Sequence, residues 1–121
     1  VAVELHTHHH RFPADDRVAA SREIAENRTA LDEWLPGERR HFCYPSGLWD
    51  TRQWAWLDDL GVRSSTTCVA GLNTAKTHRH ALRRFLDGEN IHQLEFEAEL
   101  SGFSELLRER LRPQSVPVAD T

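Results

Sequence analysis

Four histidines occupy five consecutive positions near the start of the chain, at His6, His8, His9 and His10. Imidazole nitrogens are common ligands of zinc and other divalent metals. In an extended chain residues two apart share a face, so His6, His8 and His10 would converge. If the chain turns after Thr7, His6 and His10 converge from the two ends of a loop instead. Both arrangements predict part of a metal site, because catalytic zinc commonly has three protein ligands and one open position for water.

The carboxylates nearest to the histidines are Glu4, Asp15 and Asp16. Asp15 and Asp16 follow Pro13, and they suit the first residues of a helix, where negative charge is favourable. We therefore assign neither of them as the third ligand. A solvated histidine loop without a metal is the alternative interpretation of this segment.

The spacing of apolar residues predicts the elements that must hold this segment. Val1 to Leu5 is apolar and β-branched, which is typical of a strand, and the apolar residues from Asp16 to Trp34 keep a helical spacing. Further along we expect a second apolar stretch at 41–44, a helix after Asp50 and Thr51 that ends near Gly61, and a β-prone segment at 62–69. A loop at 74–80 and a short strand at 82–86 should follow, and then a helix from Asn90 that Gly102 divides. Alternating strands and helices predict an α/β fold with a parallel sheet. Because three or four such strands leave open edges, we expect part of a larger α/β barrel.

The composition argues against several other classes of protein. The chain has 121 residues and a formal net charge of −4, so no general basic field would attract nucleic acid. No apolar run approaches the roughly 20 residues of a membrane span, and no signal peptide is visible, which slightly favours the cytoplasm. Cys43 and Cys68 are expected to be buried, reduced thiols rather than a disulfide.

Several segments together resemble the polysaccharide deacetylases, also called the NodB-homology or carbohydrate esterase 4 family. Residues 6–10, HTHHH, are similar to the family's H-T-x-x-H motif, and residues 41–50, HFCYPSGLWD, resemble its F-x-Y-P-x-G segment. Between them REIAENRTALDEWLPG resembles a helix with I-x-x-N, and WLDDLGVRSSTTCVAGLNT and LRRFLDGENI follow in the family's order. The resemblance covers most of residues 3–103.

The resemblance implies a distorted (β/α) barrel that uses a divalent metal, often zinc, to remove N-acetyl groups from a polysaccharide or amino sugar. It assigns His6 and His10 as metal ligands and Thr7 as the hydroxyl residue that supports the loop. The groove that binds the glycan would be formed by four residues, Tyr44, Pro45, Ser46 and Gly47.

Three further residues have candidate roles at such a site. Trp49 follows the groove segment and could stack on a sugar, or it could pack in the interior. His8 is a supporting or groove residue, whereas His9 is expected to be a bystander. His92 is the one candidate for the family's acid, and a solvent-exposed His92 is the alternative.

The chain also departs from the family pattern. The family's aspartate pair, which supplies the base and the third metal ligand, would lie upstream of His6, and the arginine before the Y-P segment is absent. We therefore predict that residues 1–112 form the C-terminal portion of a deacetylase domain and that 113–121 form a flexible tail. Association with the missing N-terminal half or with a second copy is expected. The alternative function is a non-catalytic module that binds a metal or a carbohydrate.

Overall fold

A small parallel sheet lies at the centre of the chain, of which the computed structural model describes residues 2–86 and 88–111. Strands β1 (His41–Cys43) and β2 (Ser64–Thr66) pair in parallel. Leu5 adds a parallel bridge to β1, and Leu82 adds one to β2. Four segments of the chain therefore lie side by side in the order in which they occur, as βα units predict.

The two outer segments of this sheet are shorter than the sequence predicts. We expected strands over 1–5 and 82–86, but each segment contributes a single bridging residue. The backbone of Leu5 is nevertheless well held, because its N–H donates to the His41 carbonyl and its carbonyl accepts from the Cys43 N–H, both at 3.0 Å. A segment at the edge of a sheet has ladder hydrogen bonds on one side only, which explains the short pairing.

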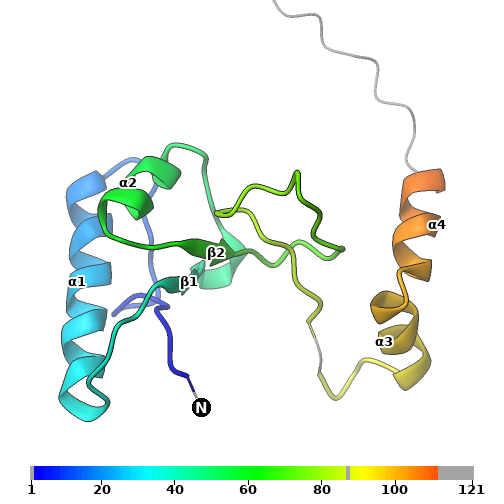
Figure 1. Ribbon diagram of the computed structural model, residues 1–121, viewed down its shortest axis with the longest axis horizontal. Helices are drawn as coiled ribbons and strands as arrows, with labels where there is room; N and C mark the ends of the chain where they lie inside the picture. The colour runs from blue at the N-terminus through cyan, green and yellow to red at the C-terminus, as the bar shows by residue number, and fades with distance from the viewer. Residues whose placement is uncertain (1, 87, 112–121) are drawn as a thin grey trace, which may run out of the picture.

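Two helices connect the segments of the sheet and lie beside it (Figure 1). Helix α1 (Arg17–Trp34) begins where predicted, and the carboxylate of Asp16 caps it by accepting a hydrogen bond from the Ala19 N–H at 2.9 Å. Helix α2 (Gln53–Asp59) ends just before Gly61, whose φ of +74° suits a residue that follows a helix.

The apolar core joins these helices to the sheet. Ile24 of α1 and Leu57 of α2 are fully buried in the same cluster as Phe42 of β1. The complete set of buried cluster members is Leu5, Ile24, Phe42, Tyr44, Leu57 and Val62. Leu5, the residue before the first histidine, is thus anchored in the core.

The remaining helices, α3 (Gln93–Leu100) and α4 (Phe103–Leu111), form a pair that Figure 1 shows on the far side of β2 from α1. Gly102 divides them, as predicted, with a φ of +80°. Arg83 pairs with Glu105 of α4 at 3.1 Å and ties the pair to the segment after β2. The predicted tail at 113–121 lies outside the described residues.

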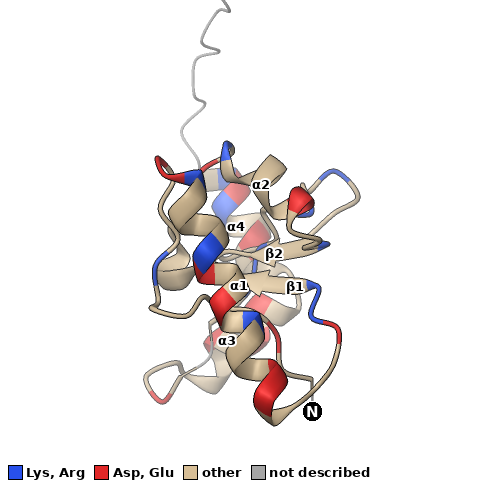
Figure 2. Ribbon diagram, turned by 90° about the vertical axis from the view of Figure 1, so that its left-hand side faces the viewer, with Lys and Arg blue, Asp and Glu red and all other residues tan. Residues whose placement is uncertain are grey.

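Three expectations from the composition can be compared with the fold. Cys43 and Cys68 are free thiols, as predicted, but both are half-buried rather than buried. Acidic and basic residues are interspersed over the elements (Figure 2). Among the described helices, none has the length and apolarity needed to cross a bilayer.

Candidate functional site

The histidines form a tight loop directly after Leu5, at the carboxyl end of the first segment of the sheet. Thr7 and His10 have φ values of 72° and 56°, a left-handed conformation that is uncommon for residues other than glycine. These two residues turn the chain, so the loop adopts the turned arrangement rather than the extended one. The rings of His6 and His10 consequently lie side by side in an edge-on arrangement, with centroids 4.9 Å apart and planes inclined by 65°.

His6 is oriented by hydrogen bonds on both its backbone and its ring. Its N–H donates to Oδ1 of Asn27 on α1 at 3.0 Å, and its Nδ1 lies 2.8 Å from the Cys43 carbonyl oxygen. A carbonyl oxygen can only accept, so the ring that makes this hydrogen bond carries its proton on Nδ1. The lone pair of Nε2 is then available to a metal, as in many metal sites where a backbone carbonyl fixes the tautomer.

Thr7 holds the turn, which is the supporting position that the resemblance implies for it. Its side chain is nearly buried, and Oγ1 accepts a hydrogen bond from the Arg11 N–H at 3.1 Å. A hydroxyl that pairs with the backbone four residues later stabilises the loop that brings His6 and His10 together.

Glu23 on α1 is a second support for the loop, and this role was not predicted from the sequence. Its carboxylate is 7% exposed and accepts from the N–H groups of His8 and His9 at 3.1 and 2.7 Å, and it lies 3.0 Å from Nδ1 of His9. Burial alone would raise the pKa of Glu23, but the hydrogen bonds from His9 and His8 outweigh it, and the pKa lies below the ordinary glutamate value. A signal was present, since Glu23 stands beside Ile24 on the inner face of the predicted helix.

Tyr44 does not line a groove, which corrects one of the predicted sugar contacts. The side chain is fully buried, and its hydroxyl donates to the His80 carbonyl at 2.9 Å. Burial raises the pKa of Tyr44 to about 12. A ring that packs in the core cannot stack on a sugar, and the alternation of the strand explains this, since Tyr44 shares the inward face of Phe42.

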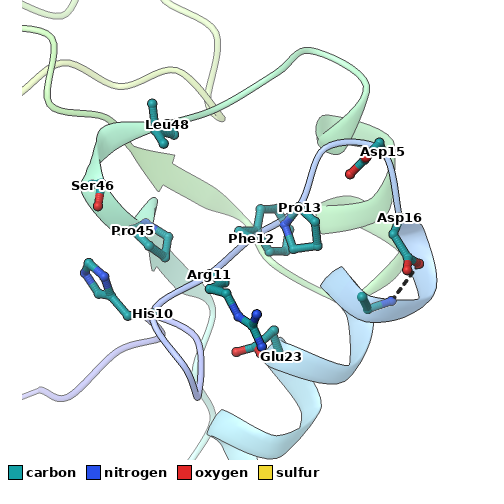
Figure 3. A pocket seen from close by; sticks show the side chains of 11 residues that line it. His10, Arg11, Phe12, Pro13, Asp15, Asp16, Glu23, Pro45, Ser46 and Leu48 are labelled. Atoms are coloured by element: carbon teal, nitrogen blue, oxygen red, sulfur yellow. Dashed lines mark hydrogen bonds between the residues drawn. The ribbon is translucent and has the colours of Figure 1, made fainter.

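The residues after Tyr44 do border a pocket that His10 also lines. Pro45, Ser46 and Gly47 form a short 3-10 turn (Pro45–Gly47), and the first two lie on the wall of a cavity of about 560 Å³. Figure 3 shows His10 and Ser46 on one side of this cavity and Asp15 and Asp16 at its far end. Gly47 packs against Cys68.

Trp49 lies in an aromatic stack at the edge of a second pocket. Its ring is stacked 5.8 Å from that of Trp54, which in turn stacks on His78 at 3.7 Å. Trp49 is 37% exposed and lines a cavity of about 400 Å³ together with Lys76 and His78. Part of its surface is therefore accessible to a ligand, whereas Trp54 is half-buried in α2.

His92 is placed away from the histidine loop. It is exposed and caps α3, where its Nδ1 accepts from the Leu94 N–H at 3.4 Å. Figure 1 shows α3 apart from the elements that carry His6 and His10. The structure thus places His92 as the exposed alternative describes, and His8 is also exposed.

The fold and the loop define an α/β protein whose histidine pair lies at the carboxyl ends of parallel segments, where barrel enzymes hold their active sites. The family described as polysaccharide deacetylase matches residues 1–65, which is more than half of the chain. The chain therefore belongs to the polysaccharide deacetylase (NodB) family.

One solved structure supports the same fold. The Streptococcus pyogenes deacetylase PplD, solved in complex with acetate, superposes with a TM-score of 0.70 at 18% sequence identity. The alignment covers 79% of this chain and 43% of PplD, so the chain spans less than half of the length of that deacetylase. A search of curated proteins gives no significant match.

Proposed function

We propose that the chain is part of a metal-dependent glycan N-deacetylase, in which His6 and His10 bind a divalent metal such as zinc. The observation that carries this proposal is the close pairing of the His6 and His10 imidazoles, whose ring centroids are 4.9 Å apart. The ring of His6 is also oriented by its contact with the Cys43 carbonyl. When bound, such a metal would polarise the acetamide carbonyl and lower the pKa of a bound water. Two nitrogen donors fit the histidine part of a zinc site.

Two pockets offer surfaces for a sugar substrate, and one of them is lined by His10. The cavity next to His10 and Ser46 would hold the N-acetyl sugar near the metal ligands, and the partly exposed ring of Trp49 would stack on a neighbouring sugar. The parallel order of the four sheet segments and the similarity to PplD support a distorted (β/α) barrel as the complete domain.

The proposal requires groups that the described residues do not supply. In residues 2–86 and 88–111, no group of three metal-binding side chains includes His6 and His10. The family resemblance implies an aspartate pair on an earlier strand as the third ligand and the base. These carboxylates would have to approach the pair from the open edge of the sheet beside Leu5.

The paired imidazoles of His6 and His10 also fit a second candidate function, a non-catalytic module that binds a metal or a glycan. A chain that spans 43% of a solved deacetylase and has a two-histidine site could bind without turnover. Hydrolysis of an N-acetyl group is expected of the deacetylase and not of the binding module.

The test is acetate release from N-acetylglucosamine oligomers by the longest natural form of the protein, with zinc or cobalt and after chelation. His6→Asn and His10→Asn should each lower the rate by about a hundredfold or more, because removing a ligand costs several kcal/mol of transition-state stabilisation. His92→Asn is the matched control, since Asn keeps the helix cap, and its rate should equal the wild type. A folded protein that binds oligomers without releasing acetate would support the binding module instead.

A further inference from the structure

The imidazoles that the proposed catalytic pair does not use form a second pair on the same loop. The rings of His8 and His9 lie 4.6 Å apart with their planes inclined by 85°. The left-handed residues Thr7 and His10 flank them and fix the turn that presents them. Both side chains are exposed, so a solute can reach them.

A carboxylate on α1 completes a set of three donors. One nitrogen from each of His8 and His9 and one oxygen of Glu26 lie within 4.8 Å of one another. Oε2 of Glu26 is 3.9 Å from Nδ1 of His9. Among the described residues this is the one group of three or more such side chains that is close enough to share an ion.

The donors are held by the folded chain before any ion binds. Glu23, one helical turn before Glu26, accepts hydrogen bonds from the backbone of His8 and His9 and contacts the ring of His9. A carboxylate that contacts a histidine ring helps to fix the orientation of that ring, as carboxylates do in many metal sites. The carboxylates of Glu23 and Glu26 also bring negative charge to this part of the surface, which attracts a cation.

We propose that His8, His9 and Glu26 form a second binding site for a divalent transition metal, separate from the His6 and His10 pair. Two imidazoles and one carboxylate leave an open position for water and suit zinc, whereas calcium and magnesium prefer sites made of oxygen donors alone. A metal here would brace the loop that carries His6 and His10, and this proposal does not depend on catalysis at that pair.

The test is calorimetric titration of the folded protein with Zn²⁺, supported by the absorption spectrum of bound Co²⁺. Glu26→Gln and His8→Ala should each weaken binding at one site by about tenfold or more, as expected when a ligand or its close support is removed. Glu33→Gln, on the same helix, is the matched control and should bind as the wild type does.

The double variant His6→Asn/His10→Asn separates this site from the proposed catalytic one. The second site should still bind Zn²⁺ in that variant, and adding Glu26→Gln should weaken this remaining binding by about tenfold or more. Unchanged binding in Glu26→Gln, with circular dichroism showing a folded protein, would overturn the proposal. Loss of all binding in His6→Asn/His10→Asn alone would also overturn it.

Discussion

Two residues that are not histidines determine how the four imidazoles are paired. Thr7 adopts a left-handed conformation and accepts the Arg11 N–H, which starts the turn. Glu23 reaches from α1 and accepts the N–H groups of His8 and His9, which holds the far side of the turn against the helix. The loop is therefore shaped both by a local contact and by contacts across the fold.

Trp49 provides a test of glycan binding at the level of one side chain. Trp49→Ala should weaken the binding of N-acetylglucosamine oligomers several-fold, because a sugar loses the aromatic face on which it stacks. Circular dichroism should confirm that the variant is folded, because Trp49 is 37% exposed and its removal also takes away the stacking on Trp54. Titration calorimetry measures the affinity. Trp34→Ala is the control, because Trp34 is 87% exposed at the end of α1, and equal affinities in the two variants would contradict the prediction.

The residue types near the site could be read from the sequence, but their pairing could not. The spacing left an extended and a turned arrangement open, because the choice depends on Glu23 and Asn27, which are distant in sequence. Tyr44 shows the converse error. Its motif indicated a groove residue, although the two-residue alternation with Phe42 of β1 already placed both rings on the side that faces the core.

At the level of elements, the patterns predicted α1, β1, α2 and β2 because each of them carries its own signals. Asp16 caps α1 through a local hydrogen bond, and Gly61 follows α2 in the conformation that ends a helix. The two outer strands were predicted to be longer than they are, because the length of an edge strand depends on its neighbours in the sheet rather than on its own residues.

Gly47 is expected to be essential to the turn after β1. Its φ is +67°, and a Cβ atom there would lie 2.6 Å from Cβ of Cys68, so Gly47→Ala combines backbone strain with a collision. Gly61→Ala is the matched control, because φ is +74° but nothing lies within 4 Å. The control should cost about 1 kcal/mol of unfolding free energy and Gly47→Ala at least twice as much. Equal losses in urea denaturation would show that the collision is relieved without cost.

His80 bridges α2 and β2, and it should make the stability of the fold depend on pH. His80 is fully buried, with Nδ1 2.9 Å from Oγ of Ser65 and Nε2 2.6 Å from the Asp58 carboxylate. Burial lowers the pKa of His80, and the hydrogen bond with Asp58 offsets part of this effect. The unfolded chain therefore binds the proton more readily, and the contribution of His80 to stability falls as pH drops through about 6.5.

His80→Gln measures this contribution. The variant should lose about 1–3 kcal/mol at neutral pH, because buried partners are left unpaired. The stability gap between wild type and variant should narrow as the pH falls from about 7.5 to about 5.5. Urea denaturation across this range gives the gap, with exposed His92→Gln as the control. A gap that stays constant or widens toward low pH would contradict the lowered pKa.

At the scale of the whole molecule, the proposed metal sites connect parts of the chain that are far apart in sequence. His6 hydrogen-bonds to β1 through the Cys43 carbonyl, and the loop is held to α1 by Glu23 and Asn27. These contacts link the first segment of the sheet, helix α1 and strand β1 around one loop. An ion that orders the loop must therefore act on the packing of all three.

Metal binding should consequently stabilise the entire fold. A ligand that binds only the folded chain adds about 2.7 kcal/mol to the unfolding free energy at one hundred times its Kd, which corresponds to several degrees in Tm for a small domain. Thermal unfolding followed by circular dichroism should show this rise with Zn²⁺ and its reversal by a chelator, whereas Mg²⁺, which prefers oxygen ligands, should have no effect. The triple variant His6→Asn/His10→Asn/Glu26→Gln should unfold at the same temperature with and without Zn²⁺. A shift of equal size in that variant would mean that the ion stabilises the protein somewhere other than this loop.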